Sequence, residues 1–157
     1  MPTTTASTII DPLVSGALRA HCIRLHPGDD LIPCLQEAAR QTGAAACFIL
    51  TTVGSLDQVS LRMASAEDGS NNEIKTWNNE RFEIVSLVGT LAPDAKHLHM
   101  CISDKDGTAF GGHLISGRVF TTVELVLGTA DGVAFSREHD PNTGYQELVV
   151  SSLSQNH

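Results

Sequence analysis

The residues best suited to chemistry are three histidines, His97, His99 and His113, which fall within one short stretch of the chain. In a β-strand, side chains at positions i and i+2 point to the same face, with Cα atoms about 6.5–7 Å apart. His97 and His99 would therefore project two imidazoles to one side of a strand, while Leu98 points to the other. Two imidazoles at this spacing can reach one cation with bonds of about 2.0–2.1 Å.

A predicted hairpin brings the third histidine to the same place. The sequence Asp104-Lys-Asp-Gly107 is typical of a hairpin turn, because glycine adopts a positive φ without strain. His99 and His113 lie at about equal distances along the chain on either side of this turn, so we expect them to be cross-strand neighbours. The pair Gly111-Gly112 permits a bulge or a close backbone approach that would re-aim His113.

Three histidines with an open fourth position are typical of a catalytic or exchangeable zinc site rather than a closed structural one. Non-haem iron usually prefers two histidines and a carboxylate. Asp104 or Asp106 could supply that carboxylate, but both lie at the predicted turn, away from His97. The sequence therefore predicts a divalent metal site, with zinc as the ion, on His97, His99 and His113.

Two other interpretations of the histidines stay open. They could be satisfied without metal, by hydrogen bonds to backbone groups or to a neighbouring subunit. Cupins also carry a His-x-His strand, but their pattern continues with a Glu ligand three or four residues later and a Pro-x-Gly before the last histidine. Here Ile102 and Ser103 occupy the Glu positions, and no Pro-x-Gly precedes His113.

The elements that would position the site are mostly strands. Alternation predicts a first strand over Arg19 to His26, and Pro27-Gly28 ends it. A helix then begins at Asp29 or Asp30, as N-cap, and ends before Gly43. Beyond it we expect a loop at Ser65 to Asn72 and turns at Gly54-Ser55 and Pro93-Asp94, with strands at 45–53, 55–64, 73–77, 82–89, 97–103, 108–114, 119–127, 133–137 and 144–150. The fold class is α+β, mostly antiparallel β-sheet with one main helix packed on it, and the last two strands complete the sheet.

Composition narrows the classes of function. The 157 residues correspond to one domain by the usual length prior, with a flexible N-terminal tail at 1–18, the domain at 19–151 and a C-terminal tail at 152–157. A net charge of −8 argues against direct nucleic-acid binding, which needs basic residues to displace phosphate counterions. No apolar run reaches the ~20 residues of a spanning helix, and no secretory signal is recognisable. Four cysteines without a Cys-x-x-Cys pair indicate small buried thiols in a reducing compartment, so we expect a cytoplasmic protein, or a nuclear one if its source is eukaryotic.

The sequence resembles the plants and prokaryotes conserved family of domains over roughly residues 19–150. The matching stretches are Arg24 to Leu31, Val53 to Ser55, Phe82 to Gly89 and, above all, His97 to Leu114, which joins His-x-His, Asp-x-Asp-Gly and Gly-Gly-His-Leu in fixed order. The resemblance implies an α+β fold and a homotrimer, and for some prokaryotic members a metal on the residues that correspond to His97, His99 and His113. In plants this domain follows AT-hooks, but no Arg-Gly-Arg-Pro core occurs in this chain, so that minor-groove contact is not expected here.

Other residues outside the triad are candidates for lesser roles. Glu124 lies inside an apolar strand and could be buried near the metal site or a subunit contact, and Arg24 could neutralise it. Arg137 and its neighbours surround a Pro-Asn turn and are expected at the surface, although His139 could add a ligand from a neighbouring chain. Trp77 is expected in the core or at a subunit interface.

Taken together, we expect a stand-alone homotrimer with a tri-histidine zinc site, acting as a binding or regulatory module for a small molecule or a protein. A zinc-dependent enzyme, in which the open position activates water or polarises a carbonyl, is the first alternative. A DNA-associated protein that acts through a partner is the second. The sequence identifies no catalytic residue, so an enzyme is the less favoured interpretation.

Overall fold

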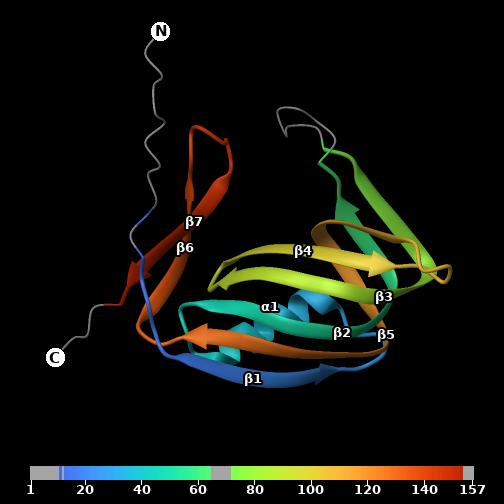
Figure 1. Cartoon of the computed structure of the whole chain (residues 1–157), viewed down its shortest axis with the longest axis horizontal. Coiled ribbons are helices and arrows are strands. Elements are labelled where there is room, and N and C mark those ends of the chain that lie inside the picture. The colour runs from blue at the N-terminus through green and yellow to red at the C-terminus, as the bar shows by residue number, and fades with distance from the viewer. Residues whose placement is uncertain (1–10, 12, 65–71, 154–157) are drawn as a thin grey trace, which may run out of the picture.

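The computed structural model describes residues 11, 13–64 and 72–153, which form one helix and seven strands (Figure 1). The main sheet has five antiparallel strands in the order β1-β5-β2-β3-β4, and β5 pairs with β4 as well. The elements are β1 Leu18–Leu25, α1 Leu31–Thr42, β2 Cys47–Arg62, β3 Ile74–Ala92, β4 Ala95–Ser103, β5 Ala109–Ala130, β6 Val133–His139 and β7 Gln146–Ser152. The predicted α+β class, with one helix after the first strand, is confirmed. Most of the expected loop, residues 65–71, lies outside the described residues. The same is true of residues 1–10 and 12 in the expected N-terminal tail and of residues 154–157 in the expected C-terminal tail.

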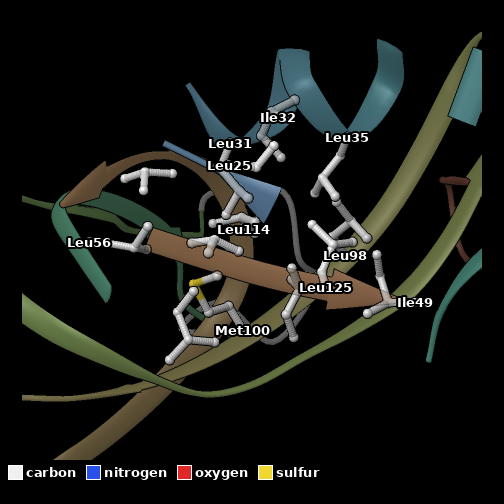
Figure 2. Close-up of a cluster of buried hydrophobic side chains, with 14 of the residues drawn as sticks. Leu25, Leu31, Ile32, Leu35, Ile49, Leu56, Leu98, Met100, Leu114 and Leu125 are labelled. Atoms are coloured by element: carbon white, nitrogen blue, oxygen red, sulfur yellow. The ribbon is translucent and has the colours of Figure 1, made fainter. Parts of the chain in front are cut away.

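Helix α1 covers one face of the sheet and contributes Leu31, Ile32 and Leu35 to the core. It begins after Asp30 and ends at Gly43, whose φ of 67° is the left-handed conformation expected of a helix-ending glycine. The Asp30 side chain makes no capping hydrogen bond, and the Asp29 carboxylate instead accepts a bond from the His26 N–H, which closes the preceding turn. Figure 2 shows the helix side chains pointing toward the strands, where the labelled core consists of Leu25, Leu31, Ile32, Leu35, Ile49, Leu56, Leu98, Met100, Leu114 and Leu125.

The turn predicted at Gly54-Ser55 is wrong, because β2 runs through it without a break. Gly54 has a φ of 144°, and a Cβ there would lie 2.1 Å from the Thr122 backbone oxygen of β5. The register with β5 shifts between Gly54 and Leu56. This glycine therefore permits a bulge and a close strand approach, which bend a long strand instead of reversing it.

Two further breaks predicted between strands are also absent. The polar stretch after Trp77 continues β3, since Asn78 pairs with Gln58 of β2. The stretch between the predicted strands 108–114 and 119–127 continues β5, with Ser116 opposite Ser60. In both places, hydrogen-bonded pairing with β2 keeps the residues in a strand. Sequence alternation alone would assign these residues to a connection between strands.

The last two strands do not complete the main sheet, contrary to expectation, but pair with each other as a separate hairpin. Strand β4 pairs with β3 on one side, and its residues His99–Ser103 pair with β5 on the other. The β6–β7 hairpin is instead connected to the rest of the fold by contacts such as the Phe135 N–H bond to the Ala45 oxygen. In Figure 1 it stands beside the turn that joins β3 to β4.

The cysteines are free thiols, but not all are buried. Cys47 is buried, whereas Cys22 is exposed, because it alternates along β1 with the inward residues Ile23 and Leu25. The expectation of uniformly buried thiols is therefore wrong for Cys22. None of the described residues forms a helix that is both long and apolar enough to cross a membrane.

Candidate metal centre

The three histidines meet where β4 and β5 pair. His97 and His99 lie on β4, and His99 is directly opposite His113 of β5, as the hairpin count predicted. One ligand nitrogen from each of the three rings lies within 4.8 Å of the other two. The ring centroids are separated by 5.0 Å, 5.2 Å and 5.4 Å, so each imidazole contacts both others.

The spacing of the nitrogens fits a shared cation. His97 Nε2 lies 3.1 Å from His99 Nε2. Two zinc–nitrogen bonds of about 2.0–2.1 Å at a tetrahedral angle would separate their nitrogens by about 3.3 Å. The same distance suits an N–H···N hydrogen bond between neutral imidazoles when no cation is bound.

His113 is the most sheltered ligand. Among the described residues, nothing forms a hydrogen bond with its buried Nδ1. Burial, reinforced by the positive charge of Arg62, by the other two histidines and by Lys96, lowers the pKa of His113 to about 4. Burial and the charge of Arg137 are the leading causes that lower the pKa of His97. Both rings are therefore neutral at pH 7, which is the protonation state that a metal ligand requires.

Glycines bring the strands close enough to assemble the triad. A Cβ on Gly112 would lie 2.7 Å from the Arg62 backbone oxygen, and one on Gly111 would lie 2.5 Å from the Met100 oxygen. The predicted close approach beside His113 is confirmed, and the β4–β5 pairing from Ala109 to His113 has no register shift, so no bulge is needed there.

Arg137 is a site residue that the sequence analysis missed. It was expected at the surface, but from β6 its Nη1 lies 3.4 Å from His97 Nδ1, and its Nη2 donates a 2.8 Å hydrogen bond to Thr90 Oγ1. The available signal was alternation, because Arg137 follows Val133 and Phe135 on the inward face of β6.

A pocket of about 370 Å³ adjoins the triad. Its walls combine the two exposed ligands, the arginine and apolar groups from β3 and β7: Val88, Gly89, Thr90, His97, His99, Arg137 and Leu148.

The remaining candidates lie elsewhere. Glu124 is exposed on β5 rather than buried, and although Arg24 is its cross-strand partner, the guanidinium donates to Thr122 Oγ1. The Asp104 carboxylate accepts backbone N–H bonds within the hairpin turn, and neither it nor any other carboxylate belongs to the ligand group in the described part of the chain.

The structure also shows where His139 and Trp77 lie. His139 is exposed at the end of β6. Trp77 packs against Phe82 and Phe110 beside the main core, which agrees with the expected core position.

The comparisons with known proteins now identify the class. The family model of the Plants and Prokaryotes Conserved (PCC) domain matches residues 14–131, and the chain belongs to this family. A solved hypothetical protein from Salmonella enterica is 35% identical, with a TM-score of 0.81 over 88% of this chain and 97% of that one. A solved metal-containing protein from Archaeoglobus fulgidus is 26% identical, with a TM-score of 0.77 over 88% of this chain and 99% of that one.

Among curated proteins, the chain is 42% identical over 145 residues to a protein from Synechococcus sp. (strain JA-3-3Ab) named bifunctional protein GlmU. The match spans 92% of this chain but only 22% of that protein. The chain therefore corresponds to about a fifth of the length of this curated relative.

Proposed function

We propose that this protein is a metal-binding module that holds one divalent ion, zinc, on His97, His99 and His113. The observation that carries the proposal is the convergence of three imidazole nitrogens within 4.8 Å of one another. One of these rings, His113, has a buried Nδ1 that forms no hydrogen bond with any described residue. The related protein from Archaeoglobus fulgidus, described as metal-containing, supports it.

The donor set favours zinc over other common ions. Three neutral nitrogen ligands suit zinc, whereas magnesium and calcium require oxygen ligands and non-haem iron usually takes a carboxylate. Within the described part of the chain three side chains form the ligand group, so a tetrahedral ion would have one position left for a ligand from solution. The ion, when bound, supplies a Lewis-acidic centre at the mouth of the pocket.

Elemental analysis tests the metal. Protein purified without chelators should contain about one zinc per chain, and His99→Ala should lose most of it. His139→Ala is the matched control, because that histidine is exposed on β6 and lies outside the triad. Wild-type protein that stays metal-free after supplementation with zinc would exclude the proposal.

We also propose that the protein is a homotrimer, an expectation that originates in the family resemblance. Support comes from large apolar side chains left exposed on the strands, among them Val53, Val85 and Val88. Contact with a neighbouring subunit would remove these apolar groups from water. Light scattering should give three times the 16.7 kDa mass of one chain, and Val53→Asp should lower it. A wild-type mass of one chain would refute the trimer.

We propose that the protein binds a small molecule or another protein and does not bind DNA directly. The net charge of −8 supports this, since it repels the phosphate backbone. Anisotropy of a labelled duplex should show no binding at physiological salt, and saturable binding there would contradict the proposal.

A further inference from the structure

Basic side chains surround the histidine triad although the chain is acidic overall. Arg62 is the cross-strand partner of His113, and Arg137 reaches His97 from the β6–β7 hairpin. Lys96 precedes His97 on β4, and its charge acts on His113. Among the described residues, Glu147 of β7 acts on His97 in the opposite sense.

This charge distribution does not suit a bare cation. Three neutral imidazoles contribute no negative charge to balance a divalent ion, and three basic groups nearby would repel it. In many metal sites a carboxylate near the ligands offsets the charge of the ion, yet no carboxylate belongs to the ligand group in the described residues. An anion that enters with the metal would offset this positive charge.

The pocket beside the triad has the shape and chemistry for such an anion. Thr90 holds the Arg137 guanidinium at its wall through a 2.8 Å hydrogen bond. Two donors of a guanidinium match the two oxygens of a carboxylate. Val88, Gly89 and Leu148 form the apolar part of the wall, which an inorganic oxyanion would leave uncovered.

We propose that this pocket binds a small organic carboxylate, paired with Arg137 and bridged to the open position of the ion that the triad holds. The inference rests on the proposed function, because the metal is one half of the binding site. The ligand class is a monocarboxylic acid with a short apolar tail. The metal site alone does not determine this class.

The contact between Arg137 and His97 also predicts that metal and carboxylate bind cooperatively. An Arg137 N–H can donate to His97 Nδ1 only while that nitrogen carries no hydrogen. A neutral imidazole that gives Nε2 to a metal must carry its hydrogen on Nδ1. Metal binding through Nε2 would therefore remove this hydrogen bond and release one Nη1 N–H from His97, while Nη1 keeps its 3.3 Å hydrogen bond to the Gln146 backbone oxygen.

The experiment measures the affinity of the protein for zinc by competition with a chelator, which sets the concentration of free zinc. The measurement is made with and without butyrate, at the same ionic strength and over the same free-zinc concentrations. We expect about 10 mM butyrate to tighten zinc binding several-fold and, by reciprocity, zinc to tighten butyrate binding by the same factor. Butyramide, which has the same shape without the charge, should have no effect. Equal effects of butyrate and butyramide, or a larger effect of phosphate than of butyrate, would overturn the carboxylate assignment.

Variants distinguish the specific contribution of the Arg137 side chain from that of positive charge in general. Arg137→Gln should abolish the coupling, and Arg137→Lys, which keeps the charge but loses the fork, should restore part of it. Arg40→Gln is the matched control, because Arg40 pairs with Glu37 on α1 and should keep the full effect. Circular dichroism and thermal unfolding would verify that each variant is folded.

The result also distinguishes the two proposals. If zinc binds tightly and butyrate changes nothing, the carboxylate site is refuted while the metal site stands. If wild-type protein does not bind zinc in chloride buffer or with butyrate, both proposals are refuted.

Discussion

The acid sensitivity of the metal-free protein should depend on His113. Its pKa is about 4 in the folded protein, against an ordinary value of 6.5. Between these values the unfolded chain binds a proton that the folded chain does not, so stability falls as the pH drops through this window. Above pH 6.5 the group contributes no pH dependence, and below about 4 the loss is complete.

The magnitude follows from the same numbers. The difference between 6.5 and about 4 would correspond to about 3.4 kcal/mol for a fully shielded ring. His113 is only half-buried, and solvent screening reduces the expected loss to about 1–2 kcal/mol.

Urea unfolding in the presence of chelator, at several values between pH 7.5 and pH 4, would measure this loss. Other groups titrate in the same range, so the informative quantity is the difference between wild type and His113→Asn. The variant should lose about 1–2 kcal/mol less than wild type over the window. His139→Asn, at an exposed position, serves as the control and should follow wild type. Parallel pH dependence of wild type and His113→Asn would refute the reasoning that burial keeps this ring neutral.

Three further predictions concern the frame of the site. Gly112→Ala should cost about 1–3 kcal/mol in urea unfolding, because the new Cβ would lie 2.7 Å from the Arg62 backbone oxygen; unchanged stability would mean that the strands separate freely. Leu98→Ala should cost about 2–5 kcal/mol, since this side chain is 1% exposed. Leu18→Ala, at a side chain that is 60% exposed, should change stability little, and equal effects would contradict the assigned core. Gly43→Ala should lower the thermal midpoint by an amount that corresponds to about 1 kcal/mol, because the φ of 67° favours glycine and then asparagine. Gly43→Asn should lower it by less. An alanine variant as stable as wild type would count against the left-handed conformation at the end of the helix.

The triad could be predicted from the sequence because its geometry is local. The i, i+2 spacing of His97 and His99 determines their common face, and one short turn determines the partner of His99. The same holds for the helix, whose ends are set by residues next to it. Such features need only the repeat of a strand and the conformation of a turn.

Features that depend on distant pairing could not be predicted in this way. Gly54 has the appearance of a turn residue, and only its neighbour Thr122 on β5 shows that it serves a bent strand. The position of the last hairpin depends on distant contacts such as the Phe135 N–H bond to the Ala45 oxygen, which no local pattern encodes. Arg137 was assigned to the surface for the same reason, since its contact with His97 crosses 40 positions of sequence.

The closure of the sheet has a consequence for the order of events in folding. Strand β2 can pair early with β3, but its pairing with β5 must wait, because Cys47 pairs with Thr129 and Arg62 with His113. Pairings between distant segments form slowly, whereas a hairpin forms within about 1–10 μs. The three imidazoles all belong to the β4–β5 hairpin, so a nascent chain that has emerged as far as Leu114 already carries the complete set. An ion captured at that stage would hold the hairpin together during synthesis, before the residues that complete the core have left the ribosome.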